Sequence, residues 1–420
     1  MPNSACEAEV VIVGAGIAGL ATAVALHRIG IGAVVLERSD GLRATGAALS
    51  LFPNAWLALD ALGISHKLNP IYVPLTEGSF TDVQSKRVQE VSLAAENCKG
   101  EVSGPRVVHR KALLEALAEE LPAGSIRFSS RLTGFETKVD PDSSEPQYTV
   151  MLDDGTAINA KVVIGCDGVH SVVARKLGLS SAISSGRWAV RGLAVFAEGH
   201  GMAHTVHQFV DAGKRAGCAA MNDKEVYWFL TCKVPENHKD ATTDPETIKK
   251  QVIEDLARDF PPIYHEVVDH ADLTTLSWAP LVFRYPWDML FGKLADGNVT
   301  VAGDAMHPMT PDLGQGGGLA LEDAVVLGRH IGFTVAAPGK LDGKKVGQAL
   351  RGYVRERWWR AAAVITGSYV SGWVQGGGTN WFTRLLRIVF YMFAFKKLVN
   401  YASKYDCGEL STRDFISSGV

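Results

Sequence analysis

The fold of this chain is decided by residues 10–37, which read VVIVGAGIAGLATAVALHRIGIGAVVLE. Val10–Val13 is a short apolar run rich in β-branched residues, which is typical of a buried parallel strand. Ile17–Ile29 carries alanine and leucine at helical spacing, and Ala33–Glu37 is a second run of strand type. The stretch therefore predicts one βαβ unit at the start of a parallel sheet.

The turn between the first strand and the helix has the pattern GxGxxG, with Gly14, Ala15, Gly16 and Gly19 in its fixed places. The first glycine permits the tight bend, the second lets backbone N–H groups reach a pyrophosphate, and the third lets the helix pack on the strand. Glu37 follows about 18 residues later, where a carboxylate accepts hydrogen bonds from an adenosine ribose. The pattern predicts a dinucleotide site and does not separate FAD from NAD.

Composition places the chain among globular proteins. Its 420 residues are 47% hydrophobic, and 42 basic against 45 acidic side chains give a net charge of −3. A nucleic-acid-binding surface would show a basic excess and a disordered chain would have fewer apolar residues, so both classes are excluded. Glycine is over-represented, with 43 residues that cluster, which indicates backbone lying close to another group.

Cysteine spacing and apolar runs bear on the compartment. The six cysteines include no CxxC pair, so we expect free thiols in the cytoplasm rather than a zinc site or a disulfide framework. Val10–His27 is uncharged, but the acidic Glu7 and Glu9 precede it, which argues against a signal peptide. Trp381–Asn400 is apolar but contains four basic residues, so it cannot span a bilayer.

The rest of the chain reads as a mixture of sheet types. Tyr148–Leu152 and Ala157–Ile164 flank an Asp-Asp-Gly turn, which predicts a β-hairpin. Between about residues 188 and 283, short alternating segments predict an antiparallel sheet with one helix over Pro245–Asp259. The C-terminal residues from 346 on are expected to be mainly helical.

Two further strands end in glycine–aspartate motifs. The strand Val162–Ile164 leads into GCDG at residues 165–168, and the strand Asn298–Ala302 leads into GDAMHP at residues 303–308. Pro311 and the glycine-rich run 314–318 follow the second motif and open a helix. Each motif by itself is usually only a turn, but their order after an N-terminal GxGxxG loop is specific.

These three motifs in this order resemble the group A FAD-dependent monooxygenases of the aromatic-hydroxylase type. Ala44–Gly63, the LGQGGG segment and Asp406–Gly408 are similar, more narrowly, to plant FAD-dependent monooxygenases related to zeaxanthin epoxidase. The resemblance covers nearly the whole chain. It implies an α/β fold with a single Rossmann-like FAD-binding domain, an inserted antiparallel-sheet substrate domain and a helical C-terminal region.

The resemblance also implies domain bounds. We expect the FAD-binding domain at residues 1–75, 100–185 and 286–345, the substrate-binding domain at 76–99 and 186–285, and the helical region at 346–420. The second domain would then be inserted into the first.

FAD is the cofactor that the resemblance implies. The residues expected to hold it are Gly14, Ala15, Gly16, Gly19, Glu37, Arg38, Arg43, Arg110, Asp167, Gly303, Asp304, Pro311, Gly314, Gly316 and Gly317. Arg110 would bond near the ribityl chain and Asp304 would accept a ribityl hydroxyl. One departure is Ala174, which stands where the family usually has arginine, with Arg175 next to it.

The resemblance implies a reaction as well. NADPH or NADH would reduce FAD as a transient co-substrate, since the chain has no second GxGxxG; O2 would add at the flavin C4a atom, and the hydroperoxide would transfer one oxygen atom. The helix that opens at Gly314–Leu319 would point its positive dipole end at the flavin and stabilise the anionic reduced ring.

The substrate is expected between the flavin and the inserted sheet, and it would be a small aromatic or isoprenoid-like molecule. Candidate substrate-binding residues are Arg191, Gln208, Phe209, Trp228 and Phe283, with His204 nearby in sequence. His207 or Tyr285 could act as the base that deprotonates a phenol. An epoxidase needs no such base and would favour an apolar, aromatic-lined tunnel, so hydroxylation and epoxidation both stay open. No cluster has metal-ligand spacing, and His307 is expected to support the motif rather than catalyse.

Two alternatives to a monooxygenase stay open: a flavin-dependent reductase or dehydrogenase on the same fold, and a non-catalytic flavin-binding regulatory protein. The aromatic segment 381–400, with basic residues at both ends, is interpreted as packing against the body of the protein; peripheral membrane contact or a dimer contact are the alternatives. The sequence leaves the oligomeric state open.

Overall fold

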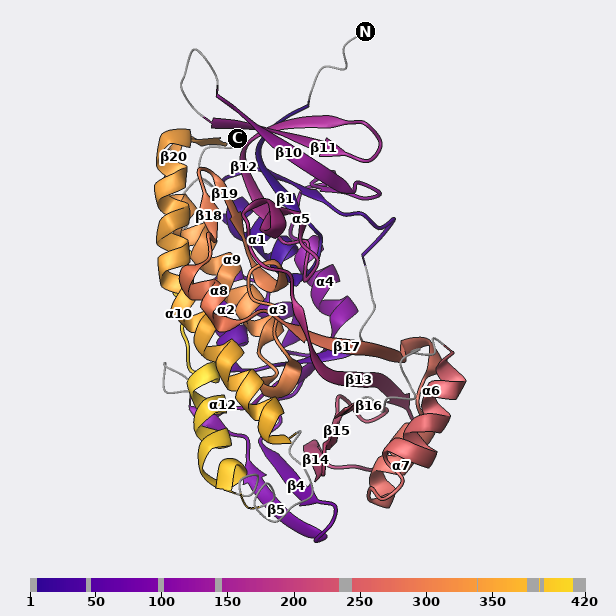
Figure 1. Cartoon of the computed structure of the whole chain (residues 1–420). Coiled ribbons are helices and arrows are strands. Elements are labelled where there is room, and N and C mark those ends of the chain that lie inside the picture. The colour runs from indigo at the N-terminus through magenta and orange to yellow at the C-terminus, as the bar shows by residue number, and fades with distance from the viewer. Residues whose placement is uncertain are drawn as a thin grey trace.

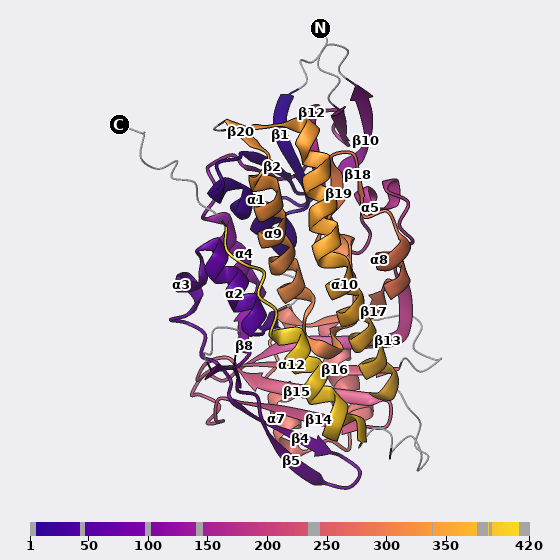
Figure 2. The ribbon, with the colours of Figure 1, turned by 90° about the vertical axis from the view of Figure 1, so that its left-hand side faces the viewer.

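The computed structural model describes residues 6–42, 47–96, 102–139, 146–233, 244–337, 339–375, 385 and 389–410. Two sheets organise these residues, one in the upper half of Figure 1 and one in the lower half. Helix α10 (Gly343–Gln375) begins beside the first sheet and runs down toward the second, with α12 (Lys396–Ser403) next to its lower part (Figure 2).

The first sheet contains the predicted βαβ unit. In spatial order its strands are β10 (Leu132–Val139), β11 (Pro146–Leu152), β12 (Ala157–Gly165), β1 (Cys6–Val13), β2 (Ala33–Leu36) and β9 (Ile126–Arg127), with β19 (Val299–Val301) beside β12 and β18 (Ala295–Asp296) beside β19. The strands β9, β2, β1, β12 and β19 pair in parallel. Strands β11 and β12 form the predicted antiparallel hairpin, and β10 adds to it as a further antiparallel strand. The motif strands therefore end at the same edge of the sheet.

Two buried helices pack on each other beside this sheet. They are α1 (Ile17–Arg28) and α9 (Gly316–Gly332), and every residue from Ile17 to Leu26 is buried. Glycine allows the close approach: a Cβ atom on Gly328 of α9 would lie 3.0 Å from that of Ala25 of α1. The uniform apolar surface of α1 reflects burial on all sides rather than at one stripe.

Shorter helices and strands connect the elements of the two sheets along the chain. They are α2 (Pro53–Leu62), α3 (Ser65–Leu68), α4 (Arg110–Ala118), α5 (Val172–Lys176), α8 (Pro286–Phe291), the pair β3 (Ala48–Leu51) and β8 (Arg106–His109), and the short strands β6 (Ala95–Glu96), β7 (Val102–Ser103), β20 (Val335–Ala337) and β21 (Lys340–Leu341).

The second sheet is almost entirely antiparallel. In spatial order its strands are β17 (Ser277–Phe283), β13 (Ile183–Val195), β16 (Glu225–Lys233), β15 (Lys214–Ala220), β14 (Thr205–Asp211), β4 (Glu77–Asp82) and β5 (Arg87–Ser92). Only β4 and β14 pair in parallel. Two segments that are far apart in sequence thus build one sheet. This arrangement confirms the predicted fold class. The domain bounds stay a prediction.

One face of the second sheet is covered by α6 (Pro245–Gln251) and α7 (Pro262–Asp269), as Figure 1 shows at the lower right. Between the sheet and these helices lies a core of its own, built around Trp228, Phe209 and Tyr264. The helix predicted over Pro245–Asp259 is shorter than expected. A π-helical turn follows α6 at Val252–Leu256, where the Ala257 amide donates to the Val252 carbonyl (2.7 Å), five residues back.

The predicted helix 381–400 is described only in part. A π-helical segment covers Phe390–Phe395 and leads into α12, whereas residues 381–384 and 386–388 lie outside the described residues. Among the helices that the structure describes, none is both long and apolar enough to cross a membrane.

Candidate active site

A cavity of about 400 Å³ lies where the motif loops of the first sheet meet the second sheet. The predicted cofactor residues that line it are Gly16, Arg110, Asp304, Pro311, Gly314, Gly316 and Gly317. From the second sheet, Ala189, Arg191, Arg215, Tyr227, Phe229, Thr231, Pro280, Leu281 and Val282 line it. The cavity therefore has a motif wall and a sheet wall.

The glycines of the first loop occupy three different environments. A Cβ atom on Gly14, which has φ +103°, would lie 2.5 Å from the carbonyl oxygen of Cys166, and one on Gly19 would overlap the carbonyl oxygen of Gly14. A Cβ atom on Gly16 would meet nothing within 4 Å. Gly14 and Gly19 thus allow backbone contacts inside the protein, whereas Gly16 leaves backbone open toward the cavity.

Glu37 fixes the shape of this loop. Its carboxylate accepts hydrogen bonds from the Ala15 amide (2.9 Å) and the Ser39 amide (2.9 Å). Glu37 is buried at the carboxyl end of β2, beyond the cavity lining, and Arg38 next to it is exposed. The predicted cofactor residue Arg43 lies outside the described residues.

Asp167 belongs to the second motif and lies just after the end of β12. One of its carboxylate oxygens accepts a hydrogen bond from the Val172 amide (2.6 Å), while Ser171 caps α5 by accepting from the Ala174 amide (2.8 Å). The other oxygen, Oδ1, is buried and has no partner in the described part of the chain. Burial raises the pKa of the Asp167 carboxyl, although hydrogen bonds from Ser171 and Val172 oppose the shift.

Ala174, where the sequence departs from the family pattern, is buried in α5, and Arg175 beside it is exposed. Neither residue lines the cavity.

The third motif brings a helix end to the cavity. Gly303 has φ +59° and donates its amide proton to Asp323 Oδ2 (2.9 Å), while the next residue, Asp304, is exposed in the cavity lining. Helix α9 begins at Gly316 after Gln315, whose side chain does not cap it. The free N–H groups and the positive dipole end of this 17-residue helix therefore face the cavity.

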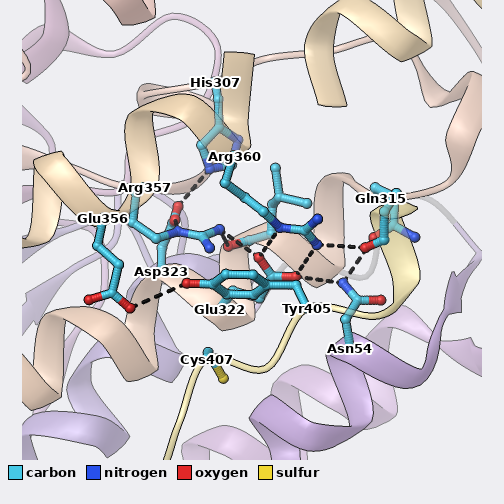
Figure 3. Close-up of polar contacts among 12 residues, drawn as sticks. Asn54, His307, Gln315, Glu322, Asp323, Glu356, Arg357, Arg360, Tyr405 and Cys407 are labelled. Atoms are coloured by element: carbon cyan, nitrogen blue, oxygen red, sulfur yellow. Dashed lines mark hydrogen bonds and ion pairs between the residues drawn. The ribbon is translucent and has the colours of Figure 1, made fainter. Parts of the chain in front are cut away.

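A buried network of charged groups holds that helix end in place (Figure 3). The Asn54 amide nitrogen donates to Gln315 Oε1 (2.9 Å) and to Glu322 Oε1 (2.6 Å). Glu322 also accepts from Arg360 (2.7 and 3.0 Å) and pairs with Arg357 (2.7 Å). The residue before the first turn of α9 is thus tied to α2 and α10.

Asp323 extends the network to His307. Arg357 Nε donates to Asp323 Oδ1 (2.7 Å), and His307 Nε2 lies 2.6 Å from Asp323 Oδ2. Burial alone would raise the pKa of the Asp323 carboxyl, but His307 and Arg357 hold it at about 2. The two carboxylates of Glu322 and Asp323 are balanced by two guanidinium groups inside the protein. His307 is fully buried and does not line the cavity, which agrees with a supporting role.

The sheet wall carries residues that the sequence did not single out. On β16, Tyr227, Phe229 and Thr231 line the cavity, and Arg215 on the neighbouring β15 lines it with them. Arg215 donates to Gln208 Oε1 (2.6 and 3.0 Å). The predicted Gln208 therefore contacts a residue of the cavity lining and does not line the cavity itself. Alternation along a strand identifies such residues as one face, but it does not say which face meets a cofactor.

Several predicted substrate and catalytic residues lie elsewhere. Phe209 and Trp228 are buried on the opposite face, in the core under α7. His207 pairs with Cys218 on that face, where its ring lies 2.9 Å from Ser79 Oγ and 3.1 Å from Thr205 Oγ1. Because successive side chains of a strand point to opposite faces, these three predictions are corrected.

The predicted residues near the end of β17 also turn away from the cavity. The Phe283 ring packs against Tyr369 of α10 (5.0 Å between centroids), and the Tyr285 ring stacks on Trp287 of α8 (3.9 Å). Neither lines the cavity, whereas Pro280, Leu281 and Val282 do. Of the predicted substrate residues, Arg191 alone contributes directly to the lining that the structure describes.

A buried ion pair joins the two walls. Arg187 of β13 donates from both terminal nitrogens to the carboxylate of Asp312 (2.9 and 2.6 Å), and both side chains are almost fully buried. Arg215 donates to the Asp312 carbonyl (3.0 Å). Since Pro311 and Gly314 flank Asp312 in the cavity lining, the ion pair sets the position of the motif wall relative to the sheet.

The residues of the motif wall fit FAD. A Cβ atom on Gly16, Gly168 or Gly316 would meet nothing within 4 Å, so a flat or phosphorylated group has open backbone to lie against. Helices α1 and α9 both begin there without side-chain caps, which suits a pyrophosphate and a polar ring edge. Among the described residues, no group of three or more histidine, cysteine, aspartate and glutamate side chains could hold a metal ion.

The family described as "FAD binding domain" matches residues 7–368 of the chain. The chain belongs to this family. Monooxygenase 2 of Arabidopsis thaliana is 39% identical over 415 residues, which cover 96% of this chain and 98% of that protein. The structure of Klebsiella pneumoniae HpxO with FAD and uric acid superposes with a TM-score of 0.80 at 25% identity, covering 94% of this chain and 96% of the other. The chain is thus an FAD-dependent monooxygenase, and the predicted resemblance to the group A and plant enzymes is confirmed.

Proposed function

We propose that this monooxygenase uses NADPH or NADH as a transient co-substrate and inserts one atom of O2 into a small aromatic or isoprenoid-like substrate held between the motif wall and the sheet wall. One observation supports this most strongly: a single cavity is lined by the FAD motifs on one side and by side chains of the second sheet on the other. Bound FAD supplies the electron transfer to O2, which side chains do not provide.

The residues of the chain have separate tasks in this proposal. Gly14, Gly16 and Gly19 hold the loop against the pyrophosphate, with Glu37 fixing its shape. The start of α9 stabilises negative charge on the flavin ring through its free N–H groups. The sheet wall, with Phe229 and Tyr227, positions the substrate and excludes water from it.

The test is isotope incorporation. Purified holoenzyme is supplied with NADPH or NADH, a candidate substrate and labelled O2, and the product mass is measured. We expect one labelled oxygen atom in the product. A product whose new oxygen atom comes from water, and is therefore unlabelled, would overturn the proposal. Equal turnover without O2 would establish the reductase or dehydrogenase alternative. If the holoenzyme turns over none of the candidate substrates, the regulatory, flavin-binding alternative would be favoured.

We propose in addition a peripheral membrane contact through the segment 381–400, of which the structure describes residues 385 and 389–400. Phe393 is 62% exposed there, and Lys397 of α12, about one helical turn further on, is exposed as well. Exposed aromatic rings beside cationic groups suit the surface of anionic lipids. Flotation with phosphatidylcholine vesicles that contain phosphatidylserine tests it: binding that Phe393→Ser weakens supports the contact, and no binding refutes it.

A further inference from the structure

Two arginines that line the cavity have no acceptor in the described part of the chain. The guanidinium groups of Arg110 and Arg191 make no hydrogen bond or ion pair there, although both border the cavity. The other arginines nearby are engaged: Arg215 is held by Gln208 and by the Asp312 carbonyl, and Arg187 by the Asp312 carboxylate. Unpaired guanidinium groups at a partly buried surface favour an anionic ligand.

The two free arginines belong to different walls. Arg110 begins α4 on the motif wall, where Asp304 is the charged group that acts on it most strongly. Burial lowers the pKa of the Arg110 guanidinium, Asp304 opposes the shift, and Arg191 adds to it, so the two cationic groups are close enough to repel each other. FAD accounts for Arg110. It leaves the charge of Arg191, on the sheet wall, without a counterpart.

Aromatic and apolar residues surround Arg191 in the cavity lining, which suits an aromatic ring that carries a charged group. Arg191 of β13 stands opposite Phe229 of β16 in the antiparallel register, and Tyr227 is close enough for Arg191 to lower the pKa of its phenol, which burial raises. The remaining lining from β17 is apolar, with Pro280, Leu281 and Val282. Antiparallel neighbours lie about 5 Å apart, within reach of one aromatic substrate.

We propose that Arg191 binds the anionic group of the substrate, and that the substrate is therefore an aromatic acid rather than a neutral isoprenoid. This inference rests on the proposed monooxygenase function and narrows it. A planar guanidinium donates two parallel hydrogen bonds to a carboxylate, so it fixes the orientation of the ring as well as its affinity. A neutral polyene would instead leave the Arg191 charge desolvated and unpaired.

The inference is tested by ligand binding to the oxidised holoenzyme without NADPH or NADH. Matched acids and amides are titrated against the flavin absorption spectrum: benzoate with benzamide, and cinnamate with cinnamamide. We expect each acid to bind about tenfold more tightly than its amide at neutral pH. Arg191→Gln should remove that preference and leave amide affinity unchanged, whereas Arg191→Lys should keep part of it. Arg258→Gln, at an exposed arginine between the π-helical turn and α7 on the far face of the second sheet, serves as the matched control.

Each outcome decides the matter. Equal binding of acids and amides, failure of both acids to perturb the spectrum, or an acid preference that survives in Arg191→Gln would overturn the inference. Loss of FAD from Arg191→Gln, with FAD retained in Arg258→Gln, would assign Arg191 to the cofactor and overturn it as well. Since binding is measured without turnover, an acid preference in a protein that incorporates no oxygen would refute the proposed function and leave the anion site standing.

Discussion

The two walls of the cavity are built on different principles. The motif wall consists mainly of backbone, with glycines at Gly16, Gly314 and Gly316 and the uncapped starts of two helices. The sheet wall consists of side chains such as Arg191, Tyr227 and Phe229 that alternate with buried ones along each strand. Backbone groups suit a ligand that never changes, since substitutions hardly alter them. Alternating side chains can be exchanged without disturbing the other face, which suits a substrate that differs between relatives.

The largest expected effect contrasts two glycines of the motif wall. Gly14→Ala places a Cβ atom against the Cys166 carbonyl at a positive φ, so we expect a stability loss of roughly 3–5 kcal/mol and protein without FAD. Gly16→Ala has open space and should fold normally while binding FAD more weakly. Thermal unfolding and the flavin absorption of the purified variants measure both. Equal behaviour of the two variants would contradict the division of roles.

The second effect contrasts the two faces of β16. Trp228→Ala empties a fully buried site beside Tyr264 and should reduce the free energy of unfolding by about 3–5 kcal/mol. Phe229→Ala, one residue along, faces the cavity and should change stability much less while it weakens substrate binding. Urea unfolding and spectral titration separate the two. A larger stability loss in Phe229→Ala would mean that the faces are assigned the wrong way round.

The third effect concerns the junction between the walls. Asp312→Ala leaves the Arg187 guanidinium buried without its partner, and breaking such a pair costs about 3 kcal/mol or more. Because the ion pair positions Pro311 in the cavity lining, we also expect Asp312→Ala to release hydrogen peroxide in place of product. Unfolding free energy and the ratio of NAD(P)H consumed to product formed are the measurements. Asp312→Glu is the matched variant, because it keeps the charge; a normal ratio in Asp312→Ala would refute the positioning role.

A smaller, pH-dependent effect is expected at the back of the motif wall. Burial alone would raise the pKa of the Glu356 carboxyl, but His330 (2.9 Å) and Arg329 (2.8 Å) lower it from 4.5 to about 2. A lowered folded-state pKa gives stability that is present above pH 4.5 and is lost as the pH falls toward 2. Glu356→Gln should therefore be less stable than the wild type at neutral pH, with the difference shrinking in acid. Melting temperatures across this range check it, and a difference that grows in acid would contradict it.

The smallest effect is expected at His207. Its ring bonds only to Ser79 and Thr205 in the described part of the chain, on the face away from the cavity, and burial lowers its pKa. His207→Gln should cost about 1 kcal/mol or less and leave the turnover rate unchanged. Stopped-flow and steady-state rates measure this. A large fall in the rate would restore His207 as the catalytic base.

The sequence alone was sufficient for the cofactor side of the protein. The GxGxxG loop, the strand ends at Asp167 and Asp304 and the glycine run before α9 are local patterns, because a turn or helix start is made by consecutive residues. They predicted the parallel sheet and the FAD family. Predictions that depend on side-chain direction were wrong for Trp228 and Phe209. Both are aromatic residues on sheet strands, yet they pack in the core between the second sheet and its helices.

What the sequence by itself determined is the first sheet, its dinucleotide loop and the family. Which face of the second sheet meets the cavity was decided only by the tertiary structure, since a period of two defines two faces and does not rank them. The contacts of Asp312 with Arg187, and of Gln315 with Asn54, likewise join residues 125 and 261 positions apart. Such pairs form only when the sheets and helices pack, because no local pattern along the chain encodes a partner at that distance.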